Sequence, residues 1–256
     1  MNILCIGDVI GSGGLACLVK HLPSLKKTKG IDVVIVNGEN SSDSNGITPD
    51  SANALFSAGI DVITTGNHVW RRREIYSYLD ENEFIIRPAN YPKTSPGKGF
   101  CVLDFGSFQL AVINLLGTVY TESLACPFET ADNILAELPT KNIIVDFHAE
   151  TTSEKRALAE YLDGRITALF GTHTHVQTAD EQILKKGTGF ITDLGMTGPS
   201  DSVLGVKTDI IIERLKNKMP GRFELADGEC QINGIIFEIS PKDGKTARVE
   251  RVNIRD

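Results

Sequence analysis

The sequence lacks any long apolar run and any excess of positive charge. No apolar stretch approaches the ~18 to 20 residues of a membrane-spanning helix, and the first residues have neither the basic start nor the length of a secretory signal. The 26 Lys and Arg are outnumbered by 33 Asp and Glu, a net charge of −7 that argues against a basic surface for duplex nucleic acid. We therefore expect a cytoplasmic protein that binds neither membranes nor duplex nucleic acid.

Cysteine is also scarce. The five cysteines are odd in number and contain no C-x-x-C pair, so neither a disulfide framework nor a thiolate metal site is indicated. They are Cys5, Cys17, Cys101, Cys126 and Cys230. We expect all of them to behave as small hydrophobic residues.

Repeats, low-complexity tracts and linkers rich in Gly, Ser or Pro are absent from the 256 residues. At 41% apolar and 23% charged residues, the chain has enough material to bury a large core. We expect a single domain over residues 1–256.

Short apolar runs rich in β-branched residues alternate with stretches of helical spacing, a pattern typical of an α/β fold. The predicted strands of this part are residues 2–6, 32–36, 61–64, 142–147 and 166–170. The predicted helices are residues 15–27, 49–58, 73–79 and 153–162. Thr48 before Pro49, and Thr151 with Glu154, supply helix-start signals. Pro23 is expected to end or kink the first helix.

The other segments favour antiparallel strands. Residues 100–105 and 109–113 flank Gly106-Ser107 and predict a β-hairpin. Strands dominate the last quarter, with one helix near 208–215. The predicted strands there are residues 189–193, 222–225, 232–239 and 246–252. The fold class is therefore α/β, with either a mixed sheet or two sheets, and residues 82–99 are expected to form an ordered surface excursion.

Polar residues of similar chemistry follow five of the apolar runs at their carboxyl ends. They are Asp8, Glu39 with Asn40, Asn67 with His68, His148, and His173 with His175. Four of the five histidines lie at such ends, and only His21, on a predicted helix surface, does not. Because ligands of α/β sheets gather at the carboxyl ends of the strands, we expect these residues to form one site.

Carboxylate, amide and imidazole groups suit manganese, iron or zinc, and no sulfur ligand lies near them in the sequence. The candidate metal ligands are Asp8, Glu39, Asn40, Asn67, His148, His173 and His175. One such ion rarely takes seven protein donors, whereas two ions with open positions for water and substrate would use them well. In an extended segment His173 and His175 would point to the same face, and either Glu39 or Asp8 could bridge the two ions.

Seven ordered motifs extend this pattern over almost the whole chain. They are Ile6-Gly7-Asp8-Val9-Ile10-Gly11, Asn37-Gly38-Glu39-Asn40, Gly66-Asn67-His68-Val69-Trp70, Arg87-Pro88-Ala89-Asn90, Phe147-His148-Ala149-Glu150, residues 171–180 (GTHTHVQTAD) and Gly195-Met196-Thr197-Gly198-Pro199. In order and context they resemble the calcineurin-like metallophosphoesterases. They are most similar to the YmdB-like 2′,3′-cyclic-nucleotide phosphodiesterases within that superfamily.

The resemblance implies a four-layer α/β/β/α sandwich with two mixed sheets and a pair of divalent ions. The usual Asp-x-His of the superfamily is Asp8-Val9-Ile10 here, and Glu39 replaces its usual aspartate. The close subfamily shows the same substitutions, with Asn40 taking the place of the missing histidine. The implied ligands are Asp8, Glu39, Asn40 and His175 for one ion, and Glu39, Asn67, His148 and His173 for the other, with Glu39 as the bridge.

The function implied is hydrolysis of 2′,3′-cyclic nucleotides by metal-hydroxide attack on phosphorus, with 3′,5′-cyclic nucleotides as further candidate substrates. Iron and manganese are the favoured metals, zinc is compatible, and a homo-oligomer is expected. His68 is left over from the ligand set and should project toward the substrate, as a general acid or as a cationic stabiliser. Arg87 and Asn90 are kept outside the predicted site, and Glu150 is expected to favour a helix N-terminus rather than to orient a ligand.

Other classes of function stay open. Gly11-Ser12-Gly13-Gly14-Leu15-Ala16 fits a dinucleotide-binding pattern, but Asp8 precedes it and the histidines would have no role. An amidohydrolase barrel would need eight βα units. A phosphomonoesterase on the same fold, or a metal-dependent regulatory protein with vestigial hydrolysis, would share the predicted ligands.

Overall fold

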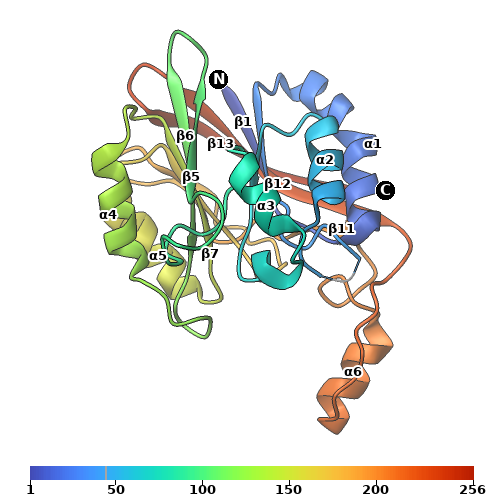
Figure 1. Ribbon diagram of the computed structural model, residues 1–256. Coiled ribbons are helices and arrows are strands. Elements are labelled where there is room, and N and C mark those ends of the chain that lie inside the picture. The colour runs from blue at the N-terminus through green and yellow to red at the C-terminus, as the bar shows by residue number, and fades with distance from the viewer. Residues whose placement is uncertain (44) are drawn as a thin grey trace.

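The computed structural model describes residues 1–43 and 45–256. Two mixed β-sheets lie face to face, and helices cover the outer face of each, as Figure 1 shows. The predicted four-layer α/β/β/α sandwich is confirmed.

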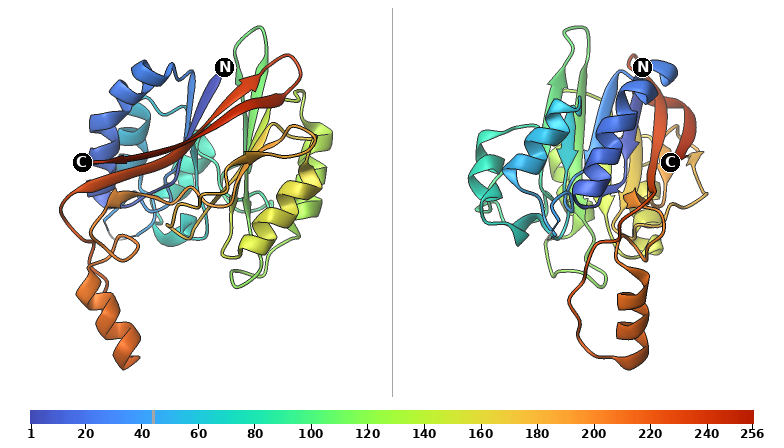
Figure 2. Two further views of the ribbon diagram at one scale, coloured as in Figure 1. Left: turned by 180° about the vertical axis from the view of Figure 1, so that it is seen from behind. Right: turned by 90° about the vertical axis from the view of Figure 1, so that its right-hand side faces the viewer.

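The first sheet has the strand order β2-β11-β12-β1-β3-β4, with β13 paired to β12. Its strands are β1 (Asn2–Ile6), β2 (Asp8–Val9), β3 (Val33–Asn37), β4 (Val62–Thr64), β11 (Met196–Pro199), β12 (Cys230–Ser240) and β13 (Lys245–Arg255). Strands β1, β3 and β4 run parallel, whereas β12 is antiparallel to β1, β11 and β13. The long β12–β13 hairpin crosses the back of the molecule in Figure 2.

The second sheet has the order β5-β6-β7-β8-β10-β9. Its strands are β5 (Phe100–Asp104), β6 (Gln109–Leu116), β7 (Ile143–His148), β8 (Ala168–Thr172), β9 (Gln182–Ile183) and β10 (Gly189–Ile191). Strands β6, β7, β8 and β10 are parallel, and the edge pairs β5–β6 and β9–β10 are antiparallel. The predicted hairpin around Gly106 is therefore confirmed.

Alternation of side chains along the strands explains the layers. In β1, Ile3 and Cys5 pack between the two sheets, whereas Leu4 and Ile6 face the helices. The helices are α1 (Gly11–Lys29), α2 (Pro49–Ser57), α3 (Ile75–Glu81), α4 (Pro127–Glu137), α5 (Thr152–Leu162) and α6 (Thr208–Asn217), with a 3₁₀ turn η1 (Val69–Arg71). Helices α1 to α3 cover the first sheet and α4 and α5 the second, while α6 stands apart from the body in Figure 1.

Of the two predicted helix starts with capping signals, the one at Thr48 has the expected side-chain cap and the one at Thr151 does not. Thr48 caps α2 through Ser51, with Pro49 in the first turn, as expected. The capping box expected at Thr151 is wrong, because Thr151 makes no side-chain cap among the described residues. Glu154 instead accepts a hydrogen bond from the backbone N of Thr118, with N and Oε1 2.8 Å apart.

Pro23 does not end the first helix, since α1 continues to Lys29. Leu22 and Leu25, on either side of the proline, are buried in the core of the first sheet. Burying two leucines can offset the roughly 3 kcal/mol that an internal proline costs a helix.

Two expectations for irregular segments are wrong. Residues 222–225 form only an isolated bridge, between Val206 and Leu225, and no strand is described there. Residues 82–99 are not a surface excursion throughout, because Ile85 and Ile86 are completely buried beside β4. Their apolar side chains pull this part of the segment into the core.

The expectation that every cysteine is a simple hydrophobic residue is also wrong. Cys17 of α1 and Cys230 of β12 form a disulfide, with Cα atoms 6.3 Å apart. Cys126 is exposed, whereas Cys5 and Cys101 are buried. The sequence could not indicate the pair, because 213 positions separate the two cysteines and only the packing of α1 on the sheet brings them together.

Candidate metal centre

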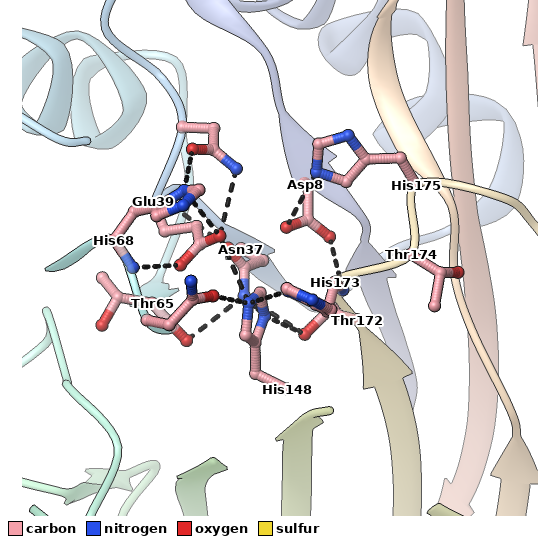
Figure 3. A network of polar contacts seen from close by, with 12 residues as sticks. Asp8, Asn37, Glu39, Thr65, His68, His148, Thr172, His173, Thr174 and His175 are labelled. Atoms are coloured by element: carbon pink, nitrogen blue, oxygen red, sulfur yellow. Dashed lines mark hydrogen bonds and ion pairs between the residues drawn. The ribbon is translucent and has the colours of Figure 1, made fainter. Parts of the chain in front are cut away.

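The polar residues at the strand ends converge on one cluster, which Figure 3 shows at the edge where both sheets end. Asp8 lies in β2, His148 ends β7, and His173 and His175 follow β8. Glu39 and Asn40 come just after β3, and Asn67 and His68 follow β4. Thus every residue predicted for the site lies in or beside this cluster, as the contacts below show.

Glu39 and His148 form the buried centre of the cluster, with exposed fractions of 1% and 0%. Glu39 Oε1 lies 3.2 Å from His148 Nε2. The same His148 nitrogen lies 3.1 Å from Asn67 Oδ1 and 3.0 Å from His173 Nδ1. One ligand atom each of Glu39, His148 and His173 lies within 4.8 Å of the others, so these three could hold a metal ion.

Asp8 and His175 form a second, looser pair. His175 Nε2 lies 3.7 Å from Asp8 Oδ1, beyond hydrogen-bond distance. Asp8 Oδ2 accepts a hydrogen bond from the backbone N of His173 at 3.2 Å. Asp8 is completely buried, and its Oδ1 has no hydrogen-bond partner within residues 1–43 and 45–256. A buried carboxylate oxygen without a donor is costly, and a cation would satisfy it.

The backbone at the cluster leaves room for the ligand atoms. A Cβ on Gly66 would lie 2.4 Å from Glu39 Oε2 and 2.3 Å from His148 Cδ2. Only glycine fits there, which explains Gly66 in the Gly-Asn-His motif. His173 and His175 have φ of +104° and +63°, so the segment is not extended as predicted. The two imidazoles instead meet different partners, His173 facing His148 and His175 facing Asp8 (Figure 3).

The titratable groups of the cluster have pKa values that are shifted in different directions. Burial disfavours the charged form of His148, but Glu39 and the other carboxylates nearby raise its pKa to about 9. Burial and the charge of His148 lower the pKa of His173 to about 4. Burial would raise the pKa of Asp8, yet His175 and His148 hold it well below its ordinary value. A proton on His148 Nε2 therefore sits among acceptor atoms, where a metal ion could replace it.

A layer of polar residues behind His148 orients the ring. His148 Nδ1 lies 2.8 Å from Thr172 Oγ1, and that hydroxyl donates to Asp146 Oδ1 at 2.7 Å. Thr172 donates its only hydroxyl proton to Asp146, so it accepts a hydrogen bond from His148 Nδ1. This bond orients the ring so that His148 Nε2 faces the cluster. Asp146 is itself completely buried, and this burial raises its pKa to about 6.

His68 lies closer to the predicted ligands than expected. Its Nδ1 is 2.8 Å from Asn40 Oδ1 and 3.5 Å from Glu39 Oε1, and its backbone N donates to Glu39 Oε2 at 3.1 Å. The side chain keeps 24% of its surface exposed, so it can still meet a bound molecule. Burial lowers the pKa of His68, although Glu39 opposes that shift.

Glu150 has a different contact from the one expected. Its Oε2 lies 3.0 Å from His173 Nε2, so the carboxylate faces a cluster histidine instead of serving a helix N-terminus. Arg87 donates to the carbonyl of Pro88 at 2.9 Å, and Asn90 donates to Leu116 O at 2.8 Å. Both residues hold loops in place through these bonds to backbone carbonyls.

Gly14 of the dinucleotide-like motif has a packing role. A Cβ on Gly14 would lie 2.3 Å from the carbonyl oxygen of Thr197, so α1 approaches β11 more closely than another residue would allow. Ser12 N donates to Asp43 Oδ1 at 2.6 Å, which places a carboxylate where a dinucleotide phosphate would bind. The dinucleotide-binding alternative therefore loses its structural basis.

The fold and the cluster of oxygen and imidazole groups together define a metallophosphoesterase, a class of hydrolase that acts with divalent metal ions. The chain belongs to the family of YmdB-like proteins, whose family model matches residues 4–252.

Within the described residues, no helix is both long and apolar enough to cross a membrane.

Relatives support this membership over the whole length. A 2′,3′-cyclic-nucleotide 2′-phosphodiesterase of Bacillus subtilis is 45% identical, and the alignment covers 100% of this chain and 98% of that protein. The crystal structure of a novel phosphatase from Mycoplasma pneumoniae matches with a TM-score of 0.95 and 34% identity, over 100% of this chain and 93% of that one. A hypothetical protein of Thermus thermophilus matches with a TM-score of 0.94 and 38% identity, over 100% of both chains.

Proposed function

We propose that this chain is a phosphodiesterase that hydrolyses 2′,3′-cyclic nucleotides with the help of two divalent metal ions. The observation that carries the proposal is the cluster at the strand ends, in which Glu39 contacts His148 and His173 contacts both His148 and Asp8. Within it, the buried Asp8 Oδ1 lacks a hydrogen-bond partner among the described residues. The substrate class is taken from the Bacillus subtilis relative, which is similar over its whole length.

We assign the metal ligands to two overlapping sets that share Glu39. The Asp8 side comprises Asp8, Glu39, Asn40 and His175, and the Glu39 side comprises Glu39, Asn67, His148 and His173. The described contacts support the Glu39 side, whose atoms surround His148 Nε2 at 3.0 to 3.2 Å. Asn40 Oδ1 now faces His68, so ligation by this oxygen requires that contact to be shared or broken.

Two ions held there would supply Lewis-acid activation of water and neutralise the charge of the phosphoryl group. The chain itself contributes the orientation of its ligands and a proton carrier. Asn40 and Glu39 face Nδ1 of His68, so we assign Nε2 to proton transfer to the departing ribose oxygen. A bound phosphate would raise the pKa of His68 and thereby counteract the effect of burial.

The test is a product assay on 2′,3′-cyclic AMP with added Mn²⁺. We expect a single product, the 3′-phosphate, because cleavage of the bond between phosphorus and the 2′-oxygen leaves the phosphate at the 3′ position. An Asp8→Asn variant is the control and should lose the activity. Absence of hydrolysis by the wild-type protein loaded with either Mn²⁺ or Fe²⁺ would refute the proposal.

Phosphomonoester hydrolysis is the second candidate, because the Mycoplasma pneumoniae structure is described as a phosphatase. The two candidates are separated by comparing rates on bis-p-nitrophenyl phosphate and p-nitrophenyl phosphate at equal Mn²⁺. We expect the diester to be the better substrate. The reverse order of rates would favour the monoesterase.

A further inference from the structure

The loop that carries His173 and His175 has an unusual backbone. Both residues have positive φ values, +104° and +63°, which side chains with a Cβ rarely adopt. Such a conformation is strained for a residue with a side chain and persists only where surrounding contacts enforce it. Thr174 lies between them, and Figure 3 shows its side chain directed away from the cluster. Asp8 contacts the backbone of His173 from the cluster side, and Leu204 O lies 3.1 Å from His175 Nδ1, so the contact that fixes Thr174 itself comes from behind the loop.

Asp193, which follows β10, provides these contacts. Its Oδ2 accepts a hydrogen bond from the backbone N of Thr174 at 3.1 Å, and its Oδ1 accepts one from Gly195 N at 2.8 Å. Its own backbone pairs with Thr178, whose N donates to Asp193 O at 3.1 Å. Asp193 thus fixes the histidine loop at Thr174 and again at Thr178.

Lys155 of α5 holds Asp193 from the other side. Its Nζ lies 2.6 Å from Asp193 Oδ2, and the two side chains are exposed by 0% and 1%. A Cβ on Gly171 would lie 2.8 Å from Lys155 Cδ and 1.9 Å from the carbonyl oxygen of Thr192. The glycine of the Gly-Thr-His motif therefore leaves the space through which the lysine reaches Asp193.

A buried ion pair is expensive to desolvate, and a well-packed apolar pair is often as stable or more so. Stability of the core alone does not explain a charged pair at this position. Asp193 uses its carboxylate for three donors: Lys155 Nζ, Thr174 N and Gly195 N. An apolar replacement would leave both backbone groups without an acceptor.

We infer that Lys155 and Asp193 are positioning residues for the metal site, and that they hold His173 and His175 at the two sides of the cluster. This inference rests on the ligand assignment proposed above. Lys155 acts through Asp193, and Asp193 acts through Thr174, the residue between the two histidines. Loss of the carboxylate should let the loop relax from its left-handed conformation and carry both imidazoles away from their partners.

The experiment measures Mn²⁺ binding to the metal-free full-length protein by equilibrium dialysis with elemental analysis, beside thermal unfolding. Asp193→Asn should weaken Mn²⁺ binding by roughly 10- to 100-fold, the range typical of residues that support metal ligands. This variant leaves Lys155 buried without its counter-charge, so it should also be less stable. The double variant Lys155→Met with Asp193→Asn removes that unpaired charge.

The double variant separates positioning from a purely structural role. It should regain thermal stability, because no unpaired charge remains buried. It should keep the weak Mn²⁺ binding, because asparagine has an amide nitrogen in place of one carboxylate oxygen and cannot accept the hydrogen bonds of both Thr174 N and Gly195 N. Recovery of Mn²⁺ binding together with stability would overturn the inference. So would wild-type Mn²⁺ affinity in Asp193→Asn.

The matched control is Asp163→Asn at the opposite end of α5. Asp163 is also buried, at 5% exposure, and accepts hydrogen bonds from the backbone N of Lys186 at 2.9 Å and of Thr188 at 3.4 Å. This variant should lower thermal stability and leave Mn²⁺ affinity unchanged. If the wild-type protein binds Mn²⁺ but fails to hydrolyse 2′,3′-cyclic AMP, the proposed function fails. Altered Mn²⁺ affinity in the Asp193 variants would then still support the positioning role.

Discussion

The Glu39 side and the Asp8 side of the cluster hold their ligand atoms at different spacings. On the Glu39 side, three acceptor atoms lie 3.0 to 3.2 Å from His148 Nε2, and the ring is fixed from behind by Thr172. On the Asp8 side, 3.7 Å separates His175 Nε2 from Asp8 Oδ1. Contacts between side chains thus hold the ligand atoms of the Glu39 side together. On the Asp8 side, Asp8 and His175 do not bond to each other, and a cation between them would bind both.

Because the two sides differ, we expect the loss of one carboxylate ligand to remove different numbers of metal ions, depending on which carboxylate is lost. Glu39 lies between the two sides and, as the proposed bridge, belongs to both. Asp8 belongs to one. Substitutions that remove a single carboxylate charge while preserving its size test this asymmetry directly.

The largest effect is expected from Glu39→Gln. Loss of the shared carboxylate should remove both metal equivalents and lower diester hydrolysis by more than the roughly 100-fold that loss of a supporting residue costs. Asp8→Asn should remove one equivalent and leave the Glu39 side occupied. Elemental analysis after dialysis measures both outcomes. Retention of two equivalents by Glu39→Gln would show that Glu39 is not the bridge.

His68→Ala should have the next largest effect. The side chain contacts Asn40 and Glu39 but is left out of the proposed ligand sets, so metal content should be unchanged. Turnover should fall by about 100-fold or more, as expected for loss of a proton donor to the leaving group. Steady-state kinetics on 2′,3′-cyclic AMP would measure this change. Near-normal turnover would exclude His68 from proton transfer.

The smallest effect is expected from Glu150→Gln. The Glu150 carboxylate lies 3.0 Å from His173 Nε2, but its side chain is 50% exposed and solvent screens its charge. Mn²⁺ binding on the Glu39 side should weaken by less than about 10-fold. Glu160→Gln is the matched control, because Glu160 is 49% exposed and pairs with Arg156 on the surface of α5. Loss of a whole metal equivalent in Glu150→Gln would place Glu150 among the ligands.

The sequence predicted the site because its signal is local. Each candidate residue follows an apolar run, and parallel strands of an α/β fold bring such positions to one edge. The convergence of Asp8, Glu39 and His148 therefore followed from strand order. Their roles as ligands remain predictions, which the metal analyses above test.

The parts that sequence reasoning missed depend on contacts between distant segments. Glu154 looked like a capping residue, but the loop at Thr118 offered it backbone donors that are invisible in the local pattern. Lys155 and Asp193 are 38 positions apart, and nothing in either neighbourhood indicates that they pair. Residues 222–225 had the composition of a strand, yet only an isolated bridge forms there, at Leu225.

The bond between Cys17 and Cys230 closes most of the polypeptide into a ring, since the two cysteines are 213 positions apart in the sequence. A protease that cuts any loop between the two cysteines produces two fragments that stay joined by the disulfide. Such nicked protein should migrate as a single species in denaturing electrophoresis until a thiol reductant separates the pieces. The cut and the reduction can therefore be followed as two distinct events in the same sample.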